Sequence, residues 1–237
     1  MDKYKQDLID LLQKNDKPEE WYRNSIFLRR GKKNYIVSMY AEYLCEKINV
    51  IKEKLGKISS KLRKDGYKTE RKIKFTDASN RRENNIARLL FKKGIELEKV
   101  GRVIDYEIPL RINSNQKIDL LCVNEEDNSL NIVELKSDKS KESILKAILE
   151  IYTYEKLIDE YNWNEYIFNL ENGNISKGIR NKKCIMLFAK TIPVDTITDE
   201  VKELLKALEI SVYIYKNNLP KEINEDSIFE LNLVDKI

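Results

Sequence analysis

The chain of 237 residues contains no histidine, and this absence removes a large set of catalytic mechanisms. Without an imidazole there is no Ser-His or Cys-His nucleophile pair, no His general base and no His-ligated zinc or iron site. Any catalysis by this chain must therefore rest on carboxylates, lysines, tyrosines or a metal ion held by oxygen atoms.

Cysteine and glycine are also scarce. The three cysteines, Cys45, Cys122 and Cys184, form no CxxC pair, so neither a zinc ribbon nor an iron–sulfur cluster is expected. Scattered thiols fit a reducing compartment, the charged N-terminal segment lacks a signal-peptide core, and no window suits a membrane span. We therefore expect a cytoplasmic protein with no membrane partner. With seven glycines and no Walker-type loop, ATP coupling is not expected.

Charged residues make up 35% of the chain, yet the net charge is only +4. The basic excess is concentrated between Lys52 and Lys93, where fifteen Lys and Arg residues accompany five Asp and Glu residues. A basic stretch of this kind suits a polyanion such as nucleic acid. It suits equally well a solvated helical surface in a lysine-rich protein, and charge alone leaves both interpretations open.

Hydrophobic periodicity predicts an α/β fold with a mixed sheet, preceded by an N-terminal helical region over residues 1–75. That region carries a short amphipathic segment and then one long helix over 35–55, which extends towards residue 62. The remainder, 76–237, is expected to form the core. Its predicted elements are helix 76–94, strands 103–110, 117–123 and 130–136, helix 142–161, strand 183–190, helix 197–208 and strand 211–216.

Two acids and a lysine interrupt otherwise apolar strands. Asp119 lies in KIDLLCV, and Glu134 and Lys136 share one face of LNIVELK. The polar segment 124–129 predicts a hairpin, which would place Asp119 and Glu134 on neighbouring strands. Burying an ionised acid in an apolar strand costs free energy unless the acid is paired or binds a metal. When two acids lie close together, the repulsion between their negative charges raises the pKa of one of them. A cation such as Mg²⁺, whose ligands are carboxylate oxygens and water, removes this cost.

Phosphodiester hydrolysis is a chemistry that uses such a set of groups. A metal ion held by Asp119 and Glu134, with the Leu135 carbonyl as a further candidate ligand, polarises a phosphoryl oxygen and lowers the pKa of a water. Lys136 then orients or deprotonates that water, or stabilises the charge that develops on phosphorus. The expected cofactor is Mg²⁺, with Mn²⁺ as a substitute.

The residues Ile118-Asp119, followed after fourteen residues by Glu134-Leu135-Lys136, resemble the motif of the PD-(D/E)XK nuclease superfamily. The family's Pro before the Asp is Ile118 here. The order of elements is also similar: a helix, a three-strand meander, a second helix and a further strand. The resemblance implies a restriction-endonuclease-like core with a central mixed sheet flanked by helices. It also implies a Mg²⁺-dependent endonuclease that hydrolyses DNA in restriction, defence or repair.

The resemblance covers residues 80–216 and implies supporting residues. In many members an acid on the helix before the meander contributes to the metal site, and Glu83 holds that place. In a subset of the family a Gln and a Tyr, four residues apart, follow the motif on the next helix. Glu150 and Tyr154 stand at those positions, so a Glu replaces the Gln.

Nucleic acid, most readily DNA, is the expected partner. Lys139 and Lys141 follow the motif directly, and Arg81 and Arg82 belong to the basic stretch, so these four are candidate phosphate contacts. Two sites, one from each subunit of a homodimer, would cut both strands of a duplex. That expectation rests on analogy with the family.

Each candidate also has a structural explanation. Glu134 and Lys136 can form an ordinary exposed pair, and Asp119 can pair with a nearby basic side chain. Glu83 can complete a capping box with Asn80, and Lys139 and Lys141 can simply face water. Two alternative functions follow: a nucleic-acid-binding protein of this fold without activity, and an interaction protein whose acids are structural.

Overall fold

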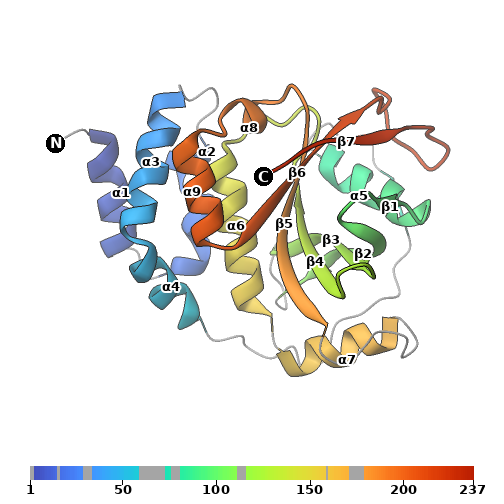
Figure 1. The fold of residues 1–237 in the computed structure, drawn as a ribbon, viewed down its shortest axis with the longest axis horizontal. Helices are drawn as coiled ribbons and strands as arrows, with labels where there is room; N and C mark the ends of the chain where they lie inside the picture. Colours follow the sequence, from blue (N-terminus) through green and yellow to red (C-terminus); the bar gives the residue numbers. More distant parts are fainter. Residues whose placement is uncertain are drawn as a thin grey trace.

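The computed structural model describes residues 3–14, 17–28, 34–58, 73–75, 81–110, 116–158, 160–170 and 179–237. Within these residues, seven strands form one sheet, and their order across the sheet equals their order along the chain (Figure 1). Helices flank this sheet, so the predicted α/β fold with a mixed sheet is confirmed at that level.

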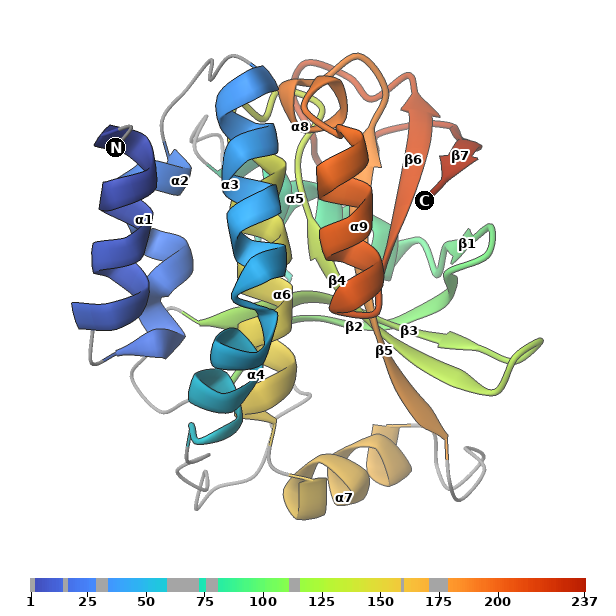
Figure 2. The same ribbon diagram turned by 60° about the vertical axis from the view of Figure 1, so that its left-hand side comes forward.

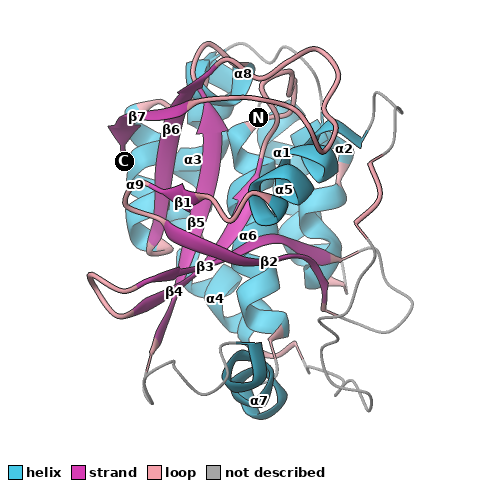
Figure 3. Ribbon diagram, turned by 90° about the vertical axis from the view of Figure 1, so that its right-hand side faces the viewer, coloured by secondary structure: helices cyan, strands magenta, loops and turns pink. Residues whose placement is uncertain are grey.

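The sheet combines antiparallel and parallel pairs and is strongly twisted (Figure 3). The first four strands are antiparallel neighbours, β5 runs parallel to β4 and to β6, and β7 is antiparallel to β6. The antiparallel pairing of β3 with β4 confirms the predicted hairpin. The strands are β1 (Glu96–Leu97), β2 (Gly101–Pro109), β3 (Lys117–Asn124), β4 (Ser129–Leu135), β5 (Arg180–Phe188), β6 (Ile210–Asn217) and β7 (Leu231–Lys236).

Helices lie on both faces of the sheet. Figure 2 shows α6, α9 and the N-terminal helices stacked together, and Figure 1 shows α5 on the other side of the strands. The helices are α1 (Lys3–Lys14), the 3-10 helix η1 (Pro18–Arg23), α2 (Ser25–Leu28), α3 (Asn34–Glu46), α4 (Ile48–Gly56), α5 (Arg82–Lys92), α6 (Ile144–Leu157), α7 (Glu160–Leu170), α8 (Ile192–Asp195) and α9 (Asp199–Ala207).

Two hydrophobic clusters hold these layers together. The larger cluster lies between the sheet and α6 and α9, and it continues into the N-terminal helices through buried residues such as Leu44 and Ile51. The smaller cluster packs Ile86 and Leu90 of α5 against the opposite face of the sheet. The N-terminal helices therefore share one core with α6 and α9. The structure does not describe the residues directly after the predicted boundary at residue 75, nor much of the basic stretch from 52 to 93.

Besides the short elements β1 and α8, which the sequence analysis does not predict, three elements differ from the sequence-based expectation. The long helix over 35–55 is two helices, because Lys47 leaves helical geometry and α4 turns to pack against η1 and α6. The helix predicted over 142–161 ends at Leu157, where Ile158 is extended, and α7 follows as a separate helix. Strand β7 was not predicted, since its side chains are mostly exposed and the sequence gives only a short alternation.

The two predicted ends of the helix over 76–94 have different outcomes. Gly94 ends α5 as predicted, and its φ of 58° is the left-handed conformation that glycine adopts readily at helix ends. The predicted caps Ser79 and Asn80 lie outside the described residues. None of the described helices combines the length and the apolar composition that crossing a membrane requires.

Candidate active site

The strand register places the two predicted acids opposite one another. Leu120 of β3 pairs with Val133 of β4, and Leu121 pairs with Ile132. One further step along this antiparallel register sets Asp119 across from Glu134. Residues directly opposite in an antiparallel pair project from the same face of the sheet, which here is the face covered by α6. Asp119 also accepts a hydrogen bond from the Leu135 N–H at 2.9 Å.

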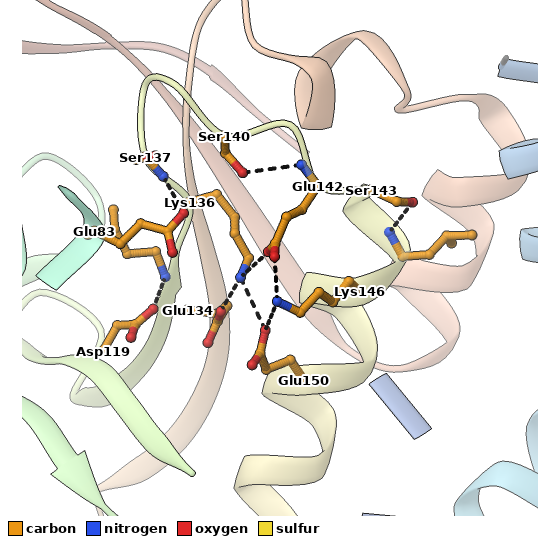
Figure 4. A network of polar contacts seen from close by, with 12 residues as sticks. Glu83, Asp119, Glu134, Lys136, Ser137, Ser140, Glu142, Ser143, Lys146 and Glu150 are labelled. Atoms are coloured by element: carbon orange, nitrogen blue, oxygen red, sulfur yellow. Dashed lines mark hydrogen bonds and ion pairs between the residues drawn. The ribbon is translucent and has the colours of Figure 1, made fainter. Parts of the chain in front are cut away.

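Lys136 sits in the centre of a group of carboxylates. Its Nζ lies 2.6 Å from Oε1 of Glu134 and 3.1 Å from an oxygen of each of Glu142 and Glu150 (Figure 4). The side chains of Lys136 and Glu134 are only 3% and 4% exposed. The alternative of an ordinary exposed pair is therefore wrong, because both groups are buried beneath α6.

Glu83 of α5 contacts the site just after the end of β4. It lies in the first turn of α5, and its Oε1 accepts a hydrogen bond from the Ser137 N–H at 3.0 Å. Arg81 occupies the N-cap of α5 and makes no side-chain cap, whereas Asn80 lies outside the described residues. Figure 4 shows Glu83 beside Asp119, at the point where β4 leads into the loop before α6.

Negative charge exceeds positive charge in this network. Five carboxylates surround two ammonium groups, a surplus of three negative charges when every group is ionised. The carboxylates are those of Glu83, Asp119, Glu134, Glu142 and Glu150, and the ammonium groups are those of Lys136 and Lys146. Glu134 and Glu150 are buried, whereas the other three carboxylates are half-buried, so the surplus favours bound protons or a cation.

The pKa shifts follow from this imbalance. Burial raises the pKa of Asp119 to about 8, against the opposing effect of Lys136. Burial and the neighbouring Asp119 raise the pKa of Glu134 well above its ordinary range. Burial also favours neutral Glu150, but Lys136 and Lys146 outweigh it and lower the pKa of Glu150 to about 2. The surroundings thus favour the protonated form of Asp119 and Glu134, and the ionised form of Glu150.

Glu150 and Tyr154, predicted as supporting residues, are both in the network. The Tyr154 hydroxyl donates to Oε1 of Glu150 at 3.0 Å, and the other carboxylate oxygen of Glu150 faces Lys136. Both side chains lie on α6 and are buried. This chain of contacts fixes the position of the Lys136 ammonium group from the side opposite Glu134.

The four predicted phosphate contacts occupy different environments. Arg81, Lys139 and Lys141 are exposed. Arg82 instead forms a two-pronged ion pair with Asp138, with N–O distances of 2.5 and 2.7 Å, and donates to the Lys221 carbonyl. The guanidinium of Arg82 thus ties α5 to the loop after β4.

Two carboxylates could bind a divalent cation at this site. The described residues contain no group of three or more His, Cys, Asp or Glu side chains already arranged to hold an ion. Asp119 and Glu134 nevertheless offer oxygen donors on one face. Asp119 keeps partial contact with solvent, through which a hydrated ion can reach it. Mg²⁺ commonly retains several waters and takes one or two carboxylates, so this donor set fits it.

Sequence reasoning missed three members of the site, namely Glu142, Lys146 and Asp138. Glu142 bridges Lys136 and Lys146, with Oε1 2.7 Å from Nζ of Lys146. Asp138 holds Arg82. The spacing of Glu142, Lys146 and Glu150 by four residues was a usable signal, since it places their side chains on one side of α6 and the turn before it. Nothing in the sequence indicated the partner of Asp138.

The comparisons with known proteins give no relative. No protein-family model matches the chain, no curated protein matches its sequence, and no solved structure matches its fold.

Proposed function

We propose that the protein is a Mg²⁺-dependent nuclease that hydrolyses phosphodiester bonds. The observation that carries the proposal is the position of Asp119 opposite Glu134, with Lys136 on the same face and its ammonium group 2.6 Å from Glu134. Two acids and an amine at one strand end match the groups that this reaction needs. The surplus of negative charge around them favours a cation as the missing partner.

Each residue has a role in the proposal. Asp119 and Glu134 would hold the ion, with the Leu135 carbonyl as a further ligand and Glu83 as a supporting acid. When bound, Mg²⁺ supplies Lewis-acid polarisation of a phosphoryl oxygen and acidifies a water. Lys136 stabilises the negative charge that develops on the phosphoryl group, or orients the attacking water. Glu150 and Tyr154 keep the Lys136 ammonium group in place.

The order of elements around the site supports a restriction-endonuclease-like core. Helix α5 bears Glu83, the antiparallel meander β2–β3–β4 bears Asp119 and Glu134, and α6 bears Glu150 before the parallel strand β5. This is the order that the motif resemblance implies. The core classification belongs to the proposal, together with the division into residues 1–75 and 76–237.

DNA is the proposed substrate, and a homodimer is the proposed form that cuts both strands. Lys139, Lys141 and Arg81 are exposed beside the loop and helix that frame the site, where they can reach a phosphate backbone. Light scattering coupled to gel filtration measures the mass of the free protein and of the protein bound to a duplex. A monomer in both conditions would remove the homodimer from the proposal and leave the cleavage chemistry untouched.

A cleavage assay tests the function directly. Supercoiled, linear, branched and single-stranded DNA, and RNA, are incubated with wild-type protein and Mg²⁺, Mn²⁺ or no divalent ion. We expect metal-dependent cutting that is lost in Asp119→Asn and Glu134→Gln. The matched control is Glu125→Gln, an acid in the turn between β3 and β4 whose side chain is 83% exposed. If no substrate is cut with either metal, the nuclease assignment fails.

One observation favours the second candidate, an inactive nucleic-acid-binding protein of the same fold. Lys136 already has three carboxylate neighbours, so the network can be satisfied as a structural ion cluster without a metal. Calorimetry with Mg²⁺ and Mn²⁺ separates the two candidates. Binding of a cation that disappears in Asp119→Asn supports the enzyme, whereas nucleic-acid binding without any cation binding supports the inactive protein.

A further inference from the structure

Glu107 of β2 has an unusual backbone conformation beside the candidate site. Its φ is 46°, in the left-handed region that residues other than Gly, Asn and Asp rarely adopt. Among the described residues, the other non-glycine residues with a positive φ lie in turns, whereas Glu107 lies inside a strand. The register pairs the residue before it with Leu120 and the residue after it with Ile118. Glu107 therefore lies across from Asp119, one of the two proposed metal ligands.

Strands β2 and β3 turn over at this row. In a regular strand, residues two positions apart face the same side of the sheet. Here the pair before Glu107 belongs to the smaller hydrophobic cluster, and the pair after it belongs to the larger cluster on the opposite face. These pairs are Tyr106–Leu120 and Ile108–Ile118. The left-handed φ of Glu107 accounts for the change of face in β2, and the hydrogen-bonded ladder carries the same change to Asp119 in β3.

Two side chains of α5 hold the Glu107 carboxylate. Nδ2 of Asn84 donates to its Oε1 at 2.5 Å, and Nε of Arg88 donates to its Oε2 at 2.8 Å. Nζ of Lys117 lies 3.7 Å from Oε1. The side chains of Arg88 and Glu107 are only 11% and 9% exposed, so water screens this ion pair little. Both carboxylate oxygens face donors of the protein, so Glu107 is an anchor between α5 and β2.

One hydrogen bond reports the position of the Asp119 carboxylate. Its Oδ2 accepts from the Leu135 N–H at 2.9 Å, so this amide depends on a side chain of the neighbouring strand. The next amide along the chain, that of Lys136, donates to the carbonyl oxygen of Met186 in β5 at 3.0 Å. That bond joins two backbone groups and does not involve Asp119. The two adjacent amides therefore distinguish a displaced carboxylate from a loosened sheet.

We propose that Glu107 is a positioning residue for Asp119. Its anchored, left-handed backbone turns β2 over beside β3 and directs the Asp119 carboxylate towards the end of β4. A strained conformation persists only where surrounding contacts hold it, and such residues concentrate at functional sites. The expected effect on cation binding rests on the proposed function. The expected effect on the hydrogen bond between Asp119 and Leu135 does not.

Amide hydrogen exchange, followed by NMR in buffer with EDTA, tests the positioning by itself. In Glu107→Ala the Leu135 amide should exchange at least about tenfold faster than in the wild type, because alanine lacks the anchors and disfavours a positive φ. The Lys136 amide should change by less than about twofold. Glu107→Gln keeps the length of the side chain and an acceptor for Arg88. Its Leu135 amide should stay within about threefold of the wild-type rate.

The matched control is Asp105→Asn, which alters another buried acid of β2. Asp105 lies across from Leu121 and accepts a hydrogen bond from the Tyr166 hydroxyl. This variant also loses the charge of a buried carboxylate, but at a position that does not face Asp119. Its Leu135 amide should keep the wild-type exchange rate within about twofold.

Calorimetry with Mn²⁺ as the probe measures the effect on the proposed metal site. Binding to Glu107→Ala should be at least about tenfold weaker than to the wild type, as is usual when a residue that orients a metal ligand is lost. Glu107→Gln and Asp105→Asn should bind within about threefold of the wild type. If the wild type binds no cation while the Leu135 amide responds as expected, the metal site fails and the positioning role of Glu107 stands.

Three results would overturn the proposal: an unchanged Leu135 rate in Glu107→Ala, an equal acceleration of the Leu135 and Lys136 amides, or exchange in Glu107→Gln as fast as in Glu107→Ala. Circular dichroism shows whether Glu107→Ala is folded. If it is not, Asn84→Ala replaces it, since this half-buried residue holds Oε1 and its loss leaves Arg88 in place. The Leu135 amide should then exchange at least about threefold faster, and an unchanged rate would also refute the proposal.

Discussion

The ammonium group of Lys136 lies 2.6 Å from the carboxylate of Glu134, one of the two acids placed to hold a cation. Lysine and cation would therefore compete for the same carboxylate. A dication held there would supply Glu134 with positive charge, and under the proposed function the ammonium group of Lys136 would then be available to a phosphoryl group. Glu142 and Glu150, both 3.1 Å from Nζ, would keep the lysine close by.

Replacement of Lys136 by Ala should separate catalysis from binding. We expect cleavage to fall by at least about 100-fold, the usual effect of losing one group that stabilises transition-state charge, while the affinity for nucleic acid changes little. Rates on supercoiled plasmid and affinities from fluorescence anisotropy give the two quantities. An equal loss in both would mean that Lys136 contributes to binding rather than to the reaction.

The same substitution should change stability in a manner that depends on divalent ions. Removal of a buried charge from its ion-pair network costs about 3–5 kcal/mol in metal-free buffer. Mg²⁺ should restore part of this loss in Lys136→Ala, because it supplies the missing positive charge. Urea unfolding with EDTA and with Mg²⁺ measures both values. The control Lys57→Ala, whose lysine side chain is 71% exposed, should lose little stability in either buffer.

Divalent cations should also stabilise the wild type. A ligand that binds only the folded state raises the free energy of unfolding, by about 2.7 kcal/mol at a concentration 100 times its dissociation constant. Thermal melting with increasing Mg²⁺, Mn²⁺ or Ca²⁺ should therefore show a rising Tm for the wild type and for Glu125→Gln. Asp119→Asn and Glu134→Gln should show a smaller rise. Equal rises in all four proteins would place the cation elsewhere.

The sequence predicted the central elements of the fold because their periodicity is strong. Strands β3 and β4, with Leu120 and Val133 at matched positions, alternate regularly, and the polar turn between them allows one simple pairing. Elements whose form depends on distant partners were not predictable. Lys47 interrupts the long N-terminal helix because α4 packs against α6, and β7 exists because β6 offers it an edge.

In the candidate site, too, the residues within regular strands could be predicted, whereas those that depend on distant partners could not. Asp119, Glu134 and Lys136 could be found from alternation within two strands, because acids in apolar strands need a partner. Glu142 was missed because its partner Lys136 is reached through the fold of the loop before α6, which periodicity does not describe. Arg82 was assigned to phosphate by its charge alone. Its two-pronged pair with Asp138 depends on how α5 meets that loop, fifty-six residues later.

Arg81 and Arg82 should behave differently although they are adjacent in sequence. Arg82→Ala breaks a mostly buried ion pair with Asp138 and should lower the free energy of unfolding by about 1–3 kcal/mol. Arg81→Ala removes an exposed side chain and should change stability by less than about 0.5 kcal/mol. If Arg81 contacts a phosphate, its loss should also reduce the slope of log affinity against log salt by about one. An unchanged slope would remove Arg81 from the interface.

Gly101 should be irreplaceable at the start of β2, and Gly56 provides the matched comparison. Gly101 has a φ of 102°, and a Cβ there would lie 2.1 Å from the carbonyl oxygen of Val123, a backbone atom that cannot move aside. Gly101→Ala should therefore destabilise the protein by more than about 2 kcal/mol. Gly56 ends α4 with no atom within 4 Å of a built Cβ, so Gly56→Ala should stabilise by about 0.5 kcal/mol. Urea unfolding of both variants measures the difference. A tolerated Gly101→Ala would mean that the start of β2 approaches Val123 of β3 less closely than the structure describes.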